Sequence, residues 1–145
     1  LKEAQETLPA TLPTGTCTMT GRMLPLTMDD FNGAPVYEKG AVTKIRFQAD
    51  CADKNGTLRR VTVWDTAARE MLQVNGATLL ELWGGCEEES GQTAFLDRMN
   101  TAKDKHFEFV VEVNIRDWKG KYSYQLGITS ATEVESLGEW VDIGS

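Results

Sequence analysis

The segment Val42–Trp64 constrains the fold of this chain most strongly. Apolar and polar residues alternate from Val42 to Cys51, which predicts a strand with one buried face. The sequence Asp53-Lys54-Asn55-Gly56 then predicts a tight turn into a second alternating strand that ends at Trp64. The predicted inward residues are Ile45, Phe47, Ala49, Cys51, Val61 and Val63, and the predicted outward residues are Lys44, Arg46, Gln48, Arg60, Thr62 and Trp64.

Helices and then a second pair of strands follow this hairpin. Helical patterns cover residues 65–73, 79–83 and 93–102, and alternating patterns cover 107–118 and 121–129. We expect the strand pairings to be antiparallel and local. This order fits a mainly β protein, a five-stranded Greek-key barrel of the OB type with inserted short helices and an N-terminal β-hairpin extension.

The chain has 145 residues, which fits a single domain. We expect an arm or linker over residues 1–15, an N-terminal hairpin over 16–40, the barrel over 41–132, and a C-terminal tail or helix over 133–145. No apolar run approaches the roughly 18 residues that a membrane span needs, so we expect no membrane partner.

Two tryptophans stand where a core residue is not expected. Trp64 closes a strand, and Trp118 lies at the tip of the predicted hairpin over residues 107–129. Aromatic rings in such places can stack on unpaired nucleobases, with cations nearby for phosphate. The candidate cations are Lys44, Arg46 and Arg60 beside Trp64, and Arg116, Lys119 and Lys121 beside Trp118. The pattern predicts a single-stranded nucleic-acid binding site, for DNA or RNA.

The net charge of −7 works against such a site, because affinity for nucleic acid rests largely on neutralising phosphates. The acids gather elsewhere, at residues 87–89 and 133–139, while the bases gather near the two tryptophans. The chain has one histidine and lacks a phosphate-binding loop and a nucleophile elbow, so we expect no enzyme.

Three cysteines, Cys17, Cys51 and Cys86, stand far apart in the sequence. An odd number without a C-x-x-C pair favours free thiols in a reducing compartment over a disulfide framework. A zinc site would need His106 as its fourth ligand and would lack a close ligand pair. We therefore expect neither a metal nor another cofactor.

Two blocks of the sequence resemble a known family. Val61–Leu82 and Phe107–Trp118 are similar, in order and spacing, to the C-terminal OB-fold of the replication protein A large subunit. The resemblance covers roughly residues 40–132 and implies that Trp64 and Trp118 stack on bases of single-stranded DNA. It also implies a nuclear protein of DNA replication, repair or recombination, either replication protein A-like or a telomere or recombination factor. Such a protein joins other subunits, with the C-terminal segment as one route for that contact.

The chain departs from the family in two respects, its acidic charge balance and its cysteines. The family carries a four-cysteine zinc ribbon before the barrel, whereas only Cys17 lies in that region here, so the hairpin over residues 16–40 is expected to replace the ribbon. Two alternatives stay open. The first is a protein-interaction OB module that assembles a nucleic-acid-maintenance complex without touching DNA, and the second is an oligosaccharide site, since OB barrels bind sugars too.

Overall fold

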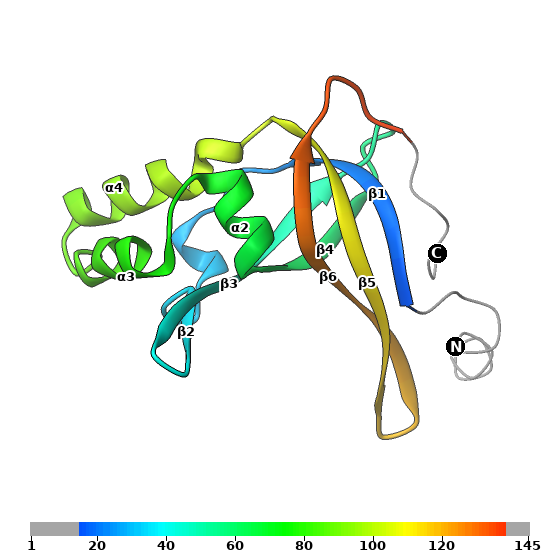
Figure 1. Cartoon of the computed structure of the whole chain (residues 1–145), viewed down its shortest axis with the longest axis horizontal. Coiled ribbons are helices and arrows are strands. Elements are labelled where there is room, and N and C mark those ends of the chain that lie inside the picture. Colours follow the sequence, from blue (N-terminus) through cyan, green and yellow to red (C-terminus); the bar gives the residue numbers. More distant parts are fainter. Residues whose placement is uncertain (1–14, 139–145) are drawn as a thin grey trace.

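The structure is a computed structural model that describes residues 15–138, apart from the side chains of residues 116–118, 121 and 122. In chain order its elements are β1 (Gly15–Met23), η1 (Met28–Asp30), β2 (Val36–Lys39), β3 (Val42–Ala52), β4 (Leu58–Trp64), α2 (Asp65–Leu72), α3 (Gly76–Gly84), α4 (Glu89–Met99), η2 (Asn100–Ala102), β5 (His106–Trp118) and β6 (Lys121–Glu133). All of the α-helices in the described part of the chain therefore lie between β4 and β5 (Figure 1).

Five strands close into a barrel. The hydrogen-bonded order runs β1, β5, β6, β4 and β3, and β3 pairs with β1 to complete the circuit, while β2 lies outside on the edge of β3. The predicted OB barrel is thereby confirmed. The expectation that every pairing is local and antiparallel is wrong, because β4 and β6 run parallel at Thr62↔Gly127 and Val63↔Ile128.

The N-terminal segment differs from the expected hairpin. β1 pairs with β5 over eight positions, from Gly15↔Val113 to Arg22↔His106, and β2 pairs only with β3 in the described part of the chain. The physical reason lies in β1 itself, which turns alternate residues inward and buries Met19 and Met23 against the barrel. The barrel therefore begins near residue 15 rather than at residue 41.

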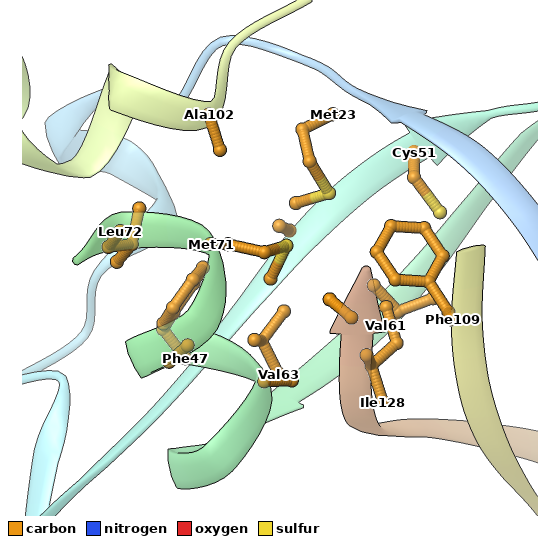
Figure 2. Close-up of a cluster of buried hydrophobic side chains, with 14 of the residues drawn as sticks. Met23, Phe47, Cys51, Val61, Val63, Met71, Leu72, Ala102, Phe109 and Ile128 are labelled. Atoms are coloured by element: carbon orange, nitrogen blue, oxygen red, sulfur yellow. The ribbon is translucent and has the colours of Figure 1, made fainter. Parts of the chain in front are cut away.

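The core lies inside the barrel and follows the predicted alternation. All six predicted inward residues of β3 and β4 are buried, as are Phe107, Phe109, Val111 and Val113 of β5. Figure 2 shows Phe109 and Ile128 facing Val61 and Val63, with Met71 reaching into the cluster from α2. Burying each such side chain stabilises the fold by about 1.5–3 kcal/mol.

The helices form where the sequence predicts them. α2 packs on β6 and β3, whereas α3 and α4 lie to the side of the barrel (Figure 1). The Asn75 side chain accepts a hydrogen bond from Thr78 N at 2.8 Å and so caps α3. Phe95 of α4 is buried and holds Phe31 and Trp83 in edge contacts, with centroid distances of 5.1 and 5.3 Å. No described helix has the length and apolarity to cross a bilayer.

The C-terminal segment was expected as a tail or helix over residues 133–145. β6 continues to Glu133, and residues 134–138 follow without helix. Two backbone N–H groups help to fasten this stretch to the barrel: Val134 N donates to His106 O at 2.9 Å, and Gly138 N donates to Thr20 Oγ1 at 2.7 Å. Residues 139–145, like the arm over residues 1–14, lie outside the described part of the chain.

Candidate functional site

A groove crosses the outer face of the barrel over β3, β4, β6 and β5. Its volume is about 380 Å³, and we call it the sheet groove. It is lined by Arg46, Gln48, Arg60, Val61, Thr62, Trp64, Glu112, Asn114, Ser123, Tyr124, Gln125, Leu126 and Gly127. A second hollow of about 320 Å³, the loop pocket, is lined by residues 30–37 and by Arg46, Phe47 and Gln48. The two hollows share Arg46 and Gln48, so they form one path over β3.

The strand register explains why the sheet groove is hollow. Gln48 of β3 pairs with Thr62 of β4, Thr62 pairs with Gly127 of β6, and Gly127 pairs with Glu112 of β5. These four residues form one row across the sheet. Because Gly127 has no side chain, the middle of the row is left open, and the indole of Trp64 leans into that space. A β-carbon at position 127 would stand 2.9 Å from Trp64 Nε1.

Trp64 is half-buried and is held by two further side chains. Tyr37 meets it edge-on, with ring centroids 6.1 Å apart and planes at 88°. The guanidinium carbon of Arg46 lies over the indole, 5.2 Å from its centroid, within the range of a cation–π contact. The indole is therefore a fixed wall of the sheet groove and keeps part of its surface open to solvent.

Asp65 holds the strand end that carries Trp64. Its buried carboxylate accepts a hydrogen bond from Ile45 N at 3.0 Å and another from Arg69 Nε at 2.9 Å. Lys44 Nζ lies 4.0 Å from the same carboxylate. This side chain fastens the first turn of α2 to β3, and an acid there also suits the positive end of the helix dipole.

The predicted cations beside Trp64 have partners within the protein. Arg60 lies in the sheet groove and pairs with Asp30 at 3.0 Å and with Asp50 at 3.4 Å. Lys44 pairs with Asp65 and does not line the sheet groove or the loop pocket. Arg46 lines both hollows and has the indole of Trp64 as its partner. The structure thus brings Arg46, Arg60 and Trp64 together and leaves Lys44 beside them.

The other predicted site residues lie at the tip of the β5–β6 hairpin, which extends beyond the barrel (Figure 1). The side chains of Arg116, Trp118 and Lys121 lie outside the described part of the chain. Lys119 is exposed in a two-residue turn, with φ of 53° for Lys119 and 78° for Gly120. Trp118 lies four positions after Asn114, which lines the sheet groove, and this corresponds to about 13 Å along a strand at about 3.3 Å per residue.

Several residues of the sheet groove were missed by the sequence reasoning as site residues. These are Gln48, Thr62, Glu112, Asn114, Ser123, Tyr124, Gln125 and Gly127. Alternation alone places Gln48 and Thr62 on the outward face, so a signal existed for those two. The β6 residues had no such signal in the sequence, because their position beside β4 depends on the parallel pairing of these two strands.

The three cysteines form no disulfide within the described part of the chain and differ in burial. Cys51 lies in the core, where burial, followed by the nearby Asp50 carboxylate, raises the pKa of its thiol to about 12 even though Arg59 lowers it. Burial also raises the pKa of the Cys17 and Cys86 thiols. Within residues 15–138, no three His, Cys, Asp or Glu side chains form a group able to hold a metal ion.

Comparison with known proteins gives likeness at the level of structure. No protein-family model and no curated protein matches the chain. A chain from a replication protein A heterotrimer bound to single-stranded DNA superposes with a TM-score of 0.63 at 14% identity, over 90% of this chain and 34% of that one. Yeast replication protein A bound to single-stranded DNA gives 0.58 at 13% identity, over 86% of this chain and 80% of that one.

This chain therefore spans about a third of the length of the first of these relatives, 34%. At identities of 14% and 13% the likeness is one of fold. Together with the strand order, it shows that the chain is an OB-fold protein.

Proposed function

We propose that this chain binds single-stranded DNA in the sheet groove, with the Trp64 indole as a stacking platform for an unpaired base. The observation that carries the proposal is the position of Trp64, a half-buried indole on the wall of a groove that crosses four barrel strands. Base–aromatic stacking is worth about 1–3 kcal/mol per base, so one fixed ring gives a useful part of a weak site's affinity. The likeness to chains solved with single-stranded DNA supports the same ligand.

The loop pocket extends the proposed path. It meets the sheet groove at Arg46 and Gln48, and Tyr37 adds a second aromatic edge there. At the other end of the groove, Trp118 is proposed as a second stacking platform, with Arg116, Lys119 and Lys121 as phosphate contacts. Lys44, Arg46 and Arg60 are proposed as further nucleic-acid-binding residues beside Trp64. A strand laid over β4 and β6 toward the hairpin tip would pass Arg46, Arg60 and Trp64, with Lys44 beside this path.

The test is a titration of labelled oligo-dT followed by fluorescence anisotropy. We expect saturable binding at low salt, roughly tenfold weaker binding for Trp64→Ala, and little change for Trp64→Phe, which keeps an aromatic ring. Leu58→Ala is the matched control, because Leu58 is an exposed residue of the same strand that lies outside the groove. A folded wild-type protein that leaves the oligonucleotide free at low salt would rule the proposal out.

We also propose a setting for this activity: a nuclear, replication protein A-like complex of DNA replication, repair or recombination, in which this chain acts as a non-enzymatic subunit. The sequence blocks Val61–Leu82 and Phe107–Trp118, which resemble the C-terminal OB-fold of the large subunit, support this setting. The competing proposal, an OB module that only binds other proteins through residues 133–145, predicts partner binding that survives Trp64→Ala and no response to DNA.

A further inference from the structure

We infer that the sheet groove recognises the edges of unpaired bases more than the phosphate backbone, so that this chain selects its single-stranded ligand by sequence. The inference rests on the proposed function and deepens it. Two independent features of the groove carry it: Arg60, one of its two cations, is already paired with two carboxylates, and its floor holds three exposed side-chain amides without a hydrogen-bond partner in the described part of the chain.

The charge balance of the groove is unfavourable for phosphate. Arg46 and Arg60 line it together with Glu112, and Asp30 and Asp50 hold Arg60 at 3.0 and 3.4 Å. Two cations thus face three carboxylates. A phosphate that approached Arg60 would have to displace both aspartates and would meet their repulsion. Phosphate contacts in the groove should therefore add little to affinity, and the salt dependence of binding should come mainly from the proposed contacts at the hairpin tip.

The amides point to the alternative source of affinity. Gln48 on β3, Gln125 on β6 and Asn114 on β5 line the groove and are exposed, and Asn114 pairs directly with Gln125 across the strands. No hydrogen bond within the described part of the chain uses these three side chains. Each amide offers a donor next to an acceptor, so a single amide can make two hydrogen bonds to one base edge.

Adenine fits this floor best. Both of its edges present an amino donor beside a ring-nitrogen acceptor, which Asn and Gln bind with two hydrogen bonds, whereas unpaired cytosine presents this pattern on one edge and thymine has its donor and acceptors on one edge. Its two-ring system also gives the larger surface for stacking on Trp64. A second bidentate contact, on the edge that only adenine offers, favours this base by about tenfold. We expect the groove to favour adenine over thymine and cytosine by about that factor.

The experiment uses three labelled twelve-nucleotide strands, each a thymidine tract whose four central bases are A, C or T, at two salt concentrations. We expect about tenfold tighter binding of the adenine strand. We also expect a slope of log K against log salt near −2, from the three proposed phosphate contacts at the hairpin tip, whereas six cations on phosphates would give about −4 at about −0.7 for each contact. In the double variant Asn114→Ala/Gln125→Ala the selectivity should fall to within twofold, and in the control Asn55→Ala, an exposed turn amide outside the groove, it should persist.

The outcomes separate this inference from the proposed function. Equal binding of all three strands, or a slope near −4, overturns base recognition and leaves single-stranded binding standing. Selectivity that survives in the folded double variant overturns the role of the amides. Absence of binding to any strand removes both proposals.

Discussion

The pyrrole edge of Trp64 packs against the α-carbon of Gly127, so closely that a methyl group on residue 127 would stand 2.9 Å from Nε1 and 3.4 Å from Cδ1 of the indole. The two residues belong to strands that run parallel, 63 positions apart in the sequence by their residue numbers. The Trp64 indole, which forms one wall of the groove, thus packs directly on Gly127, which forms the bottom of the groove. The orientation of the indole depends on the absence of a side chain at position 127.

Gly127→Ala tests this relationship. The new methyl group must push the indole aside, and Tyr37 and Arg46 on its other sides oppose that shift. Overpacking of this kind costs about 1–3 kcal/mol of unfolding free energy. Denaturant unfolding of Gly127→Ala, Trp64→Ala and the double variant forms a cycle that isolates the contact. In the Trp64→Ala background, Gly127→Ala should lower the free energy of unfolding only slightly. An undiminished loss in that background would show that the strain arises from a contact other than the one with Trp64.

Asp65→Ala should destabilise the fold by about 1–3 kcal/mol, because Ile45 N, on a fully buried residue, would lose its acceptor. Asp65→Asn keeps an oxygen for that donor and should cost less. Arg69→Ala serves as the control: it removes the partner with an exposed side chain and should cost under about 1 kcal/mol. Thermal or urea unfolding measures all three, and equal losses for Asp65→Ala and Arg69→Ala would contradict the anchoring role.

The double variant Asp30→Asn/Asp50→Asn should bind oligo-dT more tightly than the wild type. It removes the two charges that hold Arg60 and leaves the guanidinium available to phosphate. One additional phosphate contact should steepen the salt slope by about 0.7. Asp97→Asn, on an exposed residue of α4, makes the same kind of charge change away from the groove and should leave the slope unchanged. An unaltered slope in the double variant would mean that Arg60 never reaches the ligand.

The three thiols should differ in reactivity. Cys51 is 2% exposed and its thiol has a pKa of about 12, whereas Cys17 and Cys86 are only partly buried. Because the thiolate is the reactive form, a thiol reagent at pH 8 should label two cysteines of the native protein quickly and the third only after unfolding. Mass spectrometry of the labelled peptides identifies the slow site, and rapid native labelling of Cys51 would contradict its burial.

The same thiol gives a prediction about alkaline pH. Folding raises its pKa from 9.0 to about 12, so the folded state favours the protonated form. Below pH 9 the thiol is protonated in both the folded and the unfolded chain, so this group does not lower the free energy of unfolding there. Between about pH 9 and 12 only the unfolded chain ionises, so the free energy of unfolding falls. Cys51→Ala should lessen this fall, which melting temperatures measured across that pH range would show.

Local pattern predicts the strands and helices of this chain well. Alternation in β3 and β4 assigns Ile45 and Val63 to the core, and the Asp53–Gly56 turn assigns the two strands to one hairpin. The same alternation places Arg46, Arg60 and Trp64 on one surface, where the structure has them. Each of these inferences needs only neighbours in sequence and the two-residue period of a strand.

The pairing of the barrel strands and the composition of the groove depend on contacts between residues that are distant in sequence. A local pattern does not encode such contacts. Thr18 and Val110 are partners in the barrel, yet nothing in the segment around either residue indicates the other. The same holds for Asp30, whose pairing with Arg60 changes the electrostatics of the groove. From the sequence, Gly127 is only a glycine that should weaken a strand. The parallel pairing of β4 and β6 places it against the indole of Trp64.

The pairing of β1 with β5 decides where this protein can be cut. A fragment that starts at residue 41 would lack the first barrel strand and would expose the row of backbone donors and acceptors along β5 that β1 now satisfies. Such an open edge invites a strand from another molecule. Self-association of a shortened fragment would then result from the absence of β1 from the barrel. It would say nothing about how the intact protein assembles.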